Sequence, residues 1–106
     1  MARGLMVVQS GPTPGREAEY DDWYSNVHLP EICAVPGFVS GRRYRVHGDG
    51  GEYPYLAVYE IDTESDVTVP IAEWRRRSAA GETTRSGAVR SDPPPIVTIY
   101  EELDTP

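Results

Sequence analysis

Residues 19–38 (EYDDWYSNVHLPEICAVPGF) contain the side chains best suited to chemistry in this chain of 106 residues. His28, one of two histidines, follows Tyr24 by four positions and Asp21 by seven, so a regular helix would place all three on nearly one face. An imidazole titrates near neutral pH and can move a proton at an enolisable carbon or a phenol. We therefore interpret His28 as a general acid/base, with Tyr24 polarising a substrate oxygen and Asp21 fixing the imidazole tautomer.

Each of these residues also has a purely structural interpretation. His28 could bond carbonyl groups at a helix end, Tyr24 could be a core aromatic, and Asp21 could be a solvated charge. Glu31 is either a surface charge or a second group that orients the imidazole. Cys33, the single cysteine, is more often a buried small apolar residue than a nucleophile. The sequence therefore indicates a site without defining its reaction.

The basic residues of the chain are ten arginines, with no lysine. This composition excludes a lysine Schiff base and the phosphate-binding P-loop. Two histidines and one cysteine are too few for a typical four-ligand zinc site, and no dinucleotide-binding motif is present. We therefore expect neither a metal nor a cofactor, with haem ligation by His28 as a weaker alternative.

The net charge of −7 argues against nucleic acid and anionic membrane surfaces as partners, because both attract basic proteins. No apolar run approaches the ~20 residues that span a bilayer, and residues 1–4 do not begin a signal peptide. We expect a cytoplasmic protein. A length of 106 residues fits one domain over residues 1–106.

The first third of the chain predicts a strand followed by helical structure. Residues 4–10 (GLMVVQS) are apolar, of strand length, and contain two adjacent valines. Thr13 is a suitable N-cap for a helix over residues 14–28. Pro30 interrupts the helical pattern, so residues 29–35 would form a second, short helical turn.

The remaining sequence predicts three strands and one helix. Residues 38–47 and 53–61 indicate a hairpin around a glycine-rich turn. A helix is expected over residues 63–78, with a kink or restart at Pro70, and a last strand over 96–103. Strand alternation assigns to the buried face of the first hairpin strand Phe38, Ser40, Arg42, Tyr44 and Val46.

The element order is strand, helix, strand, strand, helix, strand, which matches the ferredoxin-like βαββαβ arrangement of the α+β class. In this arrangement the helices cover one face of a four-stranded antiparallel sheet. The other face would carry Val, Ile and Tyr side chains and needs a cover. A second copy of the chain is the simplest cover, so we expect a homodimer.

Three short motifs resemble a known family. Residues 23–30 (WYSNVHLP), 35–40 (VPGFVS) and 42–44 (RRY) look like the EthD-like branch of the dimeric α/β-barrel superfamily. The resemblance implies a homodimer in which two sheets form a barrel, with a pocket in each subunit between sheet and helices. Relatives include cofactor-free monooxygenases, polyketide cyclases, muconolactone isomerases, hydroxynitrile lyases and haem-using chlorite dismutases. The resemblance therefore implies a fold and a site rather than one reaction.

Aromatic residues are the expected walls of this pocket. Seven tyrosines exceed what a small core needs, since each buried hydroxyl requires a partner. Residues 81–91 are rich in small and polar side chains and could close over the pocket as a lid. The side chains expected to contact a ligand are Trp23, Tyr44, Tyr59, Trp74 and Tyr100.

We interpret the protein as a small cofactor-independent enzyme that uses general acid/base chemistry. The expected reaction is a cyclisation, isomerisation or lyase step on an aromatic or polyketide-like carbonyl compound. Two alternatives are also compatible with the sequence. One is a cofactor-free monooxygenase, and the other is a non-catalytic protein that binds a small apolar or aromatic molecule.

Overall fold

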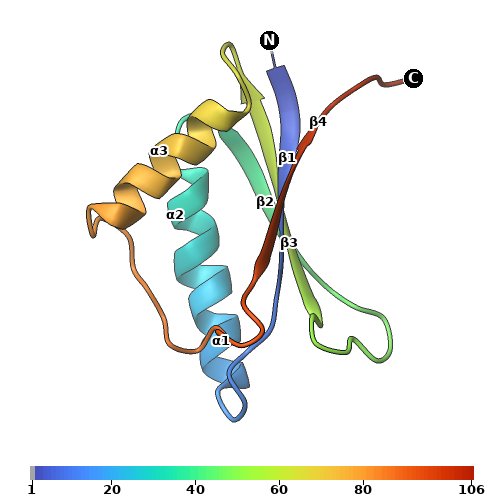
Figure 1. Ribbon diagram of the computed structural model, residues 1–106, viewed down its shortest axis with the longest axis vertical. Helices are drawn as coiled ribbons and strands as arrows, with labels where there is room; N and C mark the ends of the chain where they lie inside the picture. The colour runs from blue at the N-terminus through green and yellow to red at the C-terminus, as the bar shows by residue number, and fades with distance from the viewer. Residues whose placement is uncertain (1) are drawn as a thin grey trace.

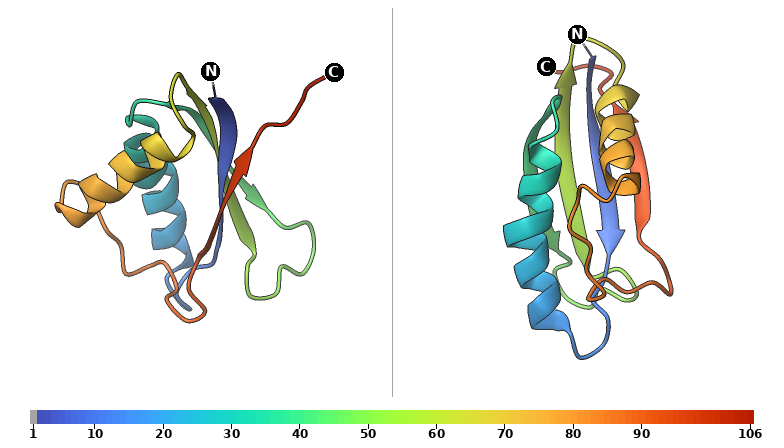
Figure 2. Two further views of the ribbon diagram at one scale, coloured as in Figure 1. Left: turned by 45° about the horizontal axis from the view of Figure 1, so that its top comes forward. Right: turned by 90° about the vertical axis from the view of Figure 1, so that its left-hand side faces the viewer.

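The computed structural model describes residues 2–106 and packs helices on one face of a four-stranded antiparallel sheet (Figure 1; Figure 2). The strand order is β2-β3-β1-β4, which confirms the predicted α+β, ferredoxin-like arrangement. The elements in chain order are β1 (Ala2–Ser10), α1 (Glu17–Trp23), the π-helical turn η1 (Tyr24–His28), α2 (Leu29–Cys33), β2 (Phe38–Arg45), β3 (Tyr55–Thr63), α3 (Thr68–Ala79) and β4 (Ile96–Glu101).

The core fills the space between the sheet and the helices. Alternate residues of each strand point to the same face, so Met6 and Val8 of β1 and Tyr59 of β3 all face the helical layer and are buried. Tyr20 and Ile32 meet them from the helical side and are almost completely buried. The helical layer is therefore held to the centre of the sheet by apolar and aromatic contacts.

The first helix begins three residues later than its sequence suggested. Thr13 does not cap it, because the Thr13 hydroxyl donates to the carbonyl oxygen of Gly87 at 2.8 Å. Instead α1 begins at Glu17, whose carboxylate accepts the backbone N–H of Gly15 at 3.2 Å. A long-range contact has replaced the local cap that the sequence indicated.

The helix does not end at His28, where a stop was predicted, but widens. The N–H of Leu29 donates to the carbonyl oxygen of Tyr24, five residues earlier, which makes residues 24–28 a π-helical turn. Pro30 follows in the first turn of α2, which continues to Cys33. In a regular α-helix the Pro30 ring would clash with the carbonyl group four residues earlier, and we attribute the wider turn to this conflict.

Pro70 produces no kink, because α3 begins at Thr68 and not at residue 63. Pro70 is thus the third residue of the helix, where a backbone N–H would have no intrahelical partner. The carboxylate of Asp66 accepts the backbone N–H of Thr68 at 2.9 Å and orders the start of the helix. None of the helices within residues 2–106 combines the length and apolar character that a membrane crossing requires.

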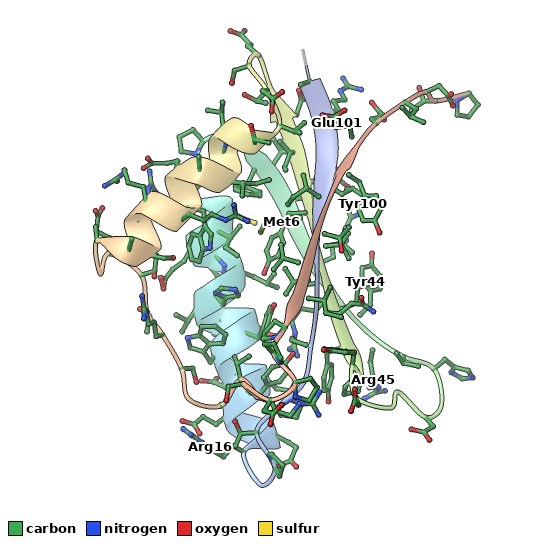
Figure 3. All side chains as sticks on the ribbon, viewed as in Figure 1. Met6, Arg16, Tyr44, Arg45, Tyr100 and Glu101 are labelled. Atoms are coloured by element: carbon green, nitrogen blue, oxygen red, sulfur yellow. The ribbon has the colours of Figure 1, made fainter. Side chains whose placement is uncertain are left out.

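A β-bulge reverses the predicted faces of β2. The pairing of β2 with β3 shifts between Phe38 and Ser40, so Val39 is an extra residue in β2. Beyond the bulge Arg43 faces the helices, whereas Tyr44, predicted to be buried, is 48% exposed on the opposite face (Figure 3). The prediction was wrong because one inserted residue moves every later side chain to the other face of the sheet.

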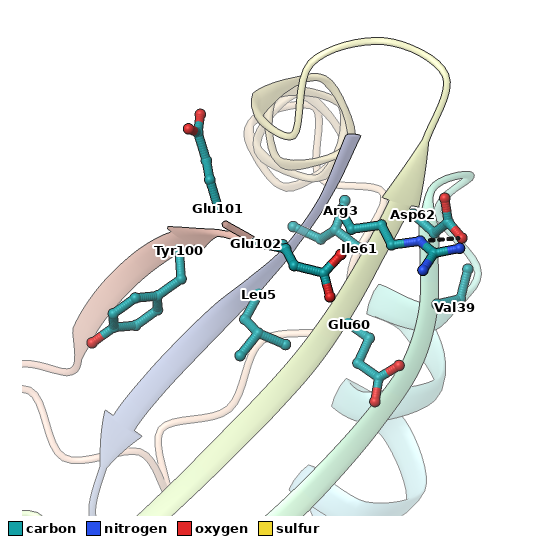
Figure 4. A pocket seen from close by; sticks show the side chains of 10 residues that line it. Arg3, Leu5, Val39, Glu60, Ile61, Asp62, Tyr100, Glu101 and Glu102 are labelled. Atoms are coloured by element: carbon teal, nitrogen blue, oxygen red, sulfur yellow. Dashed lines mark ion pairs between the residues drawn. The ribbon is translucent and has the colours of Figure 1, made fainter. Parts of the chain in front are cut away.

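The sheet face opposite to the helices, here called the open face, carries no helix (Figure 2). Tyr44 and Tyr100 project from it (Figure 3). One end of it is hollowed to about 470 Å³, and there Arg3 forms an ion pair with Asp62 at 3.5 Å (Figure 4). The large apolar side chains exposed on the open face are Val39, Tyr44, Ile96 and Tyr100.

Residues 81–91 are irregular and run from the end of α3 past the first helix toward β4 (Figure 1). Backbone hydrogen bonds hold the second half of this segment. The N–H of Thr13 donates to the carbonyl oxygen of Ala88 at 2.7 Å, and the N–H of Arg90 donates to the carbonyl oxygen of Gly11 at 2.9 Å. Ala88 is fully buried, so this part of the segment belongs to the packed structure.

Candidate active site

A cavity of about 630 Å³ lies between the helical layer and the strands β1 and β4. Its walls come from both strands, the helix over residues 17–33, α3 and residues 83–89. A pocket of this size with mostly apolar walls and few polar groups is typical of a small-molecule site. Its aliphatic surface comes mainly from Met6, Val8, Ile32, Ile71, Val89 and Val97.

His28 lines this cavity and contacts three aromatic rings. It stacks on Trp23 with ring centroids 4.4 Å apart and planes inclined by 20°. Tyr24 and Trp74 approach it edge-on, with centroids 4.9 Å and 5.5 Å away. The structure therefore brings His28 together with Tyr24 and both tryptophans at one wall of the cavity.

The π-helical turn explains the stacking of Trp23 on His28. Residues five apart in an α-helix are separated by about 140° around the axis and cannot stack. A π-helix pairs residue i with residue i+5, which places the Trp23 ring beside that of His28. Single π turns occur often at functional sites, and here the turn positions the candidate base.

Burial lowers the pKa of His28 to about 4, against a slight opposing effect of the Glu31 carboxylate. The apolar walls disfavour the charged imidazolium, so the imidazole is neutral at pH 7. Within residues 2–106 neither ring nitrogen has a hydrogen-bond partner, and the histidine is therefore not a structural cap of helix carbonyls. A neutral imidazole in a cavity can accept a proton from a bound molecule.

Two contacts tie residues 83–86 to the helix that carries His28. The Trp23 Nε1–H donates to the carbonyl oxygen of Thr84 at 3.2 Å, and the Thr84 N–H donates to the Glu31 carboxylate at 2.9 Å. The Trp23 ring, five residues before His28, stacks on the imidazole, and the Glu31 carboxylate, three residues after it, acts on the pKa of His28. Glu31 therefore binds the backbone of residues 83–86 and also raises the pKa of His28. Whether the segment opens as a lid remains a prediction.

Asp21 does not reach His28, contrary to the sequence interpretation. Its carboxylate accepts a hydrogen bond from Arg43 Nη2 at 2.8 Å, and Arg43 Nη1 donates to Ser25 Oγ at 2.9 Å. The π turn is again the reason, because each wider turn advances less rotation per residue and moves residue 21 off the face of residue 28. Asp21 positions Arg43 and not the imidazole.

Arg43 is a partly buried cation whose side chain is 17% exposed. Its guanidinium lies over the rings of Tyr20, Tyr24 and Tyr55, with its central carbon 5.4, 5.1 and 5.4 Å from the three centroids. Desolvated cation–π contacts are worth roughly 2 kcal/mol. Arg43 therefore clamps β2 and β3 to the first helix beside the cavity.

Replacing Arg43 with methionine is expected to lower the free energy of unfolding by about 2–3 kcal/mol, because Asp21 loses its partner and the tyrosine rings lose their cation. Chemical denaturation measures this loss. The matched control is Arg42→Met in the neighbouring exposed residue, whose 3.5 Å ion pair with Glu60 is worth at most about 1 kcal/mol. Equal losses in the two variants would contradict the assigned role.

Buried hydroxyl groups lie close to the cavity, and two of the residues that carry them, Ser10 and Tyr24, line it. Ser10 Oγ and the Tyr20 hydroxyl are 2.6 Å apart and hydrogen-bonded, and Ser10 also lines the cavity. Burial raises the pKa of Tyr24 to about 12 and also raises that of Tyr59. Both phenols stay protonated at neutral pH, and Tyr24, which lines the cavity, can offer an O–H donor there but no negative charge.

Of the five residues expected to contact a ligand, the structure places Trp23 and Trp74 on the cavity wall. Tyr59 is fully buried in the core, where its ring packs edge-on against Phe38 at 6.2 Å. Tyr44 and Tyr100 are on the open face, away from the cavity (Figure 3). Fewer of these aromatic residues therefore line the cavity than the sequence suggested, and the two that do are tryptophans.

The sequence interpretation did not identify several polar residues that line the cavity, among them Ser10, Arg75 and Arg85. Ser10 continues the alternation of Met6 and Val8 on β1, and this alternation could have revealed it. Arg75 follows Trp74 on α3, and Arg85 lies in the irregular segment, where no periodicity locates a side chain. Only the tertiary structure shows that Arg85 lines the cavity.

The chemistry of the cavity rests on His28 as its one imidazole. Across the described part of the chain, from residue 2 to residue 106, no three or more His, Cys, Asp or Glu side chains are grouped to hold a metal ion. His47 is exposed near the β2–β3 turn and belongs to another part of the molecule.

Comparison with known proteins gives fold relatives. No protein-family model and no curated protein match the sequence. An ethyl tert-butyl ether D (EthD) family protein from Bacillus halodurans C-125 superposes with a TM-score of 0.62 at 18% identity, covering 97% of this chain and 100% of its own. A protein from Shewanella loihica PV-4 described as a putative monooxygenase gives a TM-score of 0.60 at 20% identity, covering 99% of both chains. The chain thus shares the fold of the EthD-like proteins that its motifs resemble.

Proposed function

We propose that the protein is a small enzyme of the EthD-like branch that uses His28 as a general base on an aromatic or polyketide-like carbonyl compound. The observation that carries this proposal is the neutral imidazole held by a π-helical turn in an apolar cavity. Trp23 and Trp74 both contact His28 and line the cavity, so their rings would pack against a flat apolar substrate beside the imidazole. No cofactor is required for this chemistry.

The proposed first step is the transfer of a proton to His28. A C–H bond next to a carbonyl group breaks, an N–H bond forms on the imidazole, and the electron pair moves to the carbonyl oxygen as an enolate. An enolate beside the ring raises the proton affinity of His28, because opposite charges favour the imidazolium. Ser10 and Tyr24 line the cavity, and their hydroxyl groups would donate to the enolate oxygen. Returning the proton to another carbon gives an isomerisation, and attack on a second carbonyl gives a cyclisation.

The proposal includes a homodimer formed through the open face. This face exposes Val39 and Tyr44 on β2 and Ile96 and Tyr100 on β4, and no helix covers the strands between them. A second sheet packed on it would complete the barrel that the sequence motifs imply. Cytoplasmic location and the single-domain assignment likewise remain our expectations.

A cofactor-free monooxygenase is the second candidate, and the fold of the Shewanella loihica protein favours it. The same first step would serve, because a phenolate or enolate formed by His28 is electron-rich enough to react with O₂ itself. The substrate would then be oxidised and O₂ reduced, with one oxygen atom entering the product and the other leaving as water.

Deuterium exchange tests the proposed base without knowledge of the natural substrate. The probe is 2-tetralone, a fused aromatic ketone with enolisable hydrogens, followed in D₂O by NMR with and without the protein. The proposal predicts exchange well above the buffer rate, equal under argon and air. Tight binding of 2-tetralone without faster exchange would contradict it and favour a carrier. Consumption of an electron-rich dihydroxynaphthalene only in air would favour the monooxygenase.

A further inference from the structure

We propose that the ligand of the cavity carries a carboxylate and that Arg75 and Arg85 bind this group at the cavity wall. The proposal rests on the proposed function, since it takes the same cavity as the ligand site and adds the chemical class of the ligand. Both arginines line the cavity together with His28 and Trp74. Neither belongs to the proton-transfer step described above.

The charge of the cavity is opposite to that of the chain. Acidic residues outnumber basic ones by 17 to 10 in the sequence. Among the lining residues, however, the charged side chains are Arg75 and Arg85 alone, and His28 is neutral. A cavity with apolar walls and two cations attracts an anion, because low-dielectric walls strengthen the field of the charges.

Neighbouring carboxylates are already engaged by other arginines. Glu73 pairs with Arg76 at 2.8 Å and with Arg77 at 2.7 Å, and Glu82 pairs with Arg76 at 3.1 Å. Arg75, between these groups in sequence, forms no ion pair within residues 2–106. Its guanidinium therefore has its donors available for a ligand.

Arg85 is held beside the same wall by the end of α3. Its Nη2 donates to the carbonyl oxygen of Ser78 at 3.2 Å, and Ser78 itself lines the cavity. This bond uses one of the five N–H donors of a guanidinium and leaves the others free. Like Arg75, Arg85 has no carboxylate partner in the described part of the chain. Both arginines line the cavity from solvent-exposed positions, and the fork of each guanidinium matches the planar geometry of a carboxylate.

Two probes with the same ring and similar size, one anionic and one neutral, test this inference. The anion 2-naphthoate and the neutral 2-naphthamide are titrated against the protein, following quenching of Trp23 and Trp74, the two tryptophans of the chain. Both rings line the cavity, so the signal reports the site. We expect 2-naphthoate to bind about tenfold more tightly, since each partly exposed ion pair contributes up to about fivefold. This preference should fall as salt is added.

The double variant Arg75→Gln/Arg85→Gln is expected to remove the preference while 2-naphthamide still binds. The matched control removes the same charge from exposed positions on β2, as Arg42→Gln/Arg45→Gln, and should keep the preference. Equal affinities for the two probes in the native protein, a preference that survives in the cavity variant, or no binding of either probe would overturn the proposal.

Failure of this inference is distinguishable from failure of the proposed function. Equal probe affinities with rapid, His28-dependent exchange into 2-tetralone would overturn the carboxylate but keep the base. A clear preference for 2-naphthoate without any exchange would leave the two arginines as binding residues and overturn the enzyme. Both measurements concern the same cavity, but deuterium exchange tests His28 whereas the probe affinities test Arg75 and Arg85.

Discussion

Replacing His28 with glutamine is expected to slow protein-catalysed deuterium exchange into 2-tetralone by about 10²–10⁴-fold, the usual contribution of a general base. Glutamine keeps a polar planar group of similar size but cannot accept a proton at neutral pH. The stacked Trp23 ring and the π-helical turn place the imidazole within the cavity. Exchange rates from NMR, measured at equal concentrations of folded protein, check this result.

The other histidine supplies a matched control. His47 is exposed and does not line the cavity, so His47→Gln should leave the exchange rate unchanged. An unchanged rate in the His28 variant would remove the histidine from the reaction. An equal loss in both variants would point to buffer-like surface catalysis and would equally contradict the proposed site.

The fold could be predicted because element order and hydrophobic periodicity constrain it strongly. The sequence also identified His28, Tyr24, Trp23 and Trp74, which meet at one wall of the cavity. The four-residue spacing of Tyr24 and His28 keeps these two side chains together in an α or a π turn, whereas the stacking of Trp23 on His28 depends on the π turn. The local motif therefore carried the core of the site.

What could not be predicted arose from single-residue irregularities. The π turn separated Asp21 from His28, and the bulge at Val39 moved Tyr44 to the open face. Each irregularity inserts about one residue into a regular repeat. The side chains beyond it then point in a different direction, although the sequence pattern hardly changes. Arg43 and Arg85 depend on tertiary contacts, which periodicity does not contain. The sequence pattern therefore predicted the regular helices and strands but not the π turn or the β-bulge that interrupt them.

His28 is expected to make the native protein less stable in acid. Its pKa is about 4 in the folded protein against 6.5 for a free imidazole, so the unfolded chain binds more protons between these values. The contribution to stability is therefore complete above about pH 6.5 and is lost as pH falls toward 4. From pH 7 to pH 5 the loss is about 2 kcal/mol, taking 1.36 kcal/mol for each pKa unit. The neighbouring Glu31 carboxylate opposes this effect only in part.

Chemical denaturation of the native protein and of His28→Gln at pH 7 and pH 5, at one protein concentration, isolates this contribution. Other groups titrate in both proteins and cancel in the difference. The native protein should lose about 2 kcal/mol more than the variant on acidification, whereas His47→Gln should match the native protein. Parallel losses in all three would mean that the imidazole is solvated. A solvated His28 would undermine the apolar cavity on which the proposed base depends, so this measurement tests the physical premise of the mechanism separately from turnover.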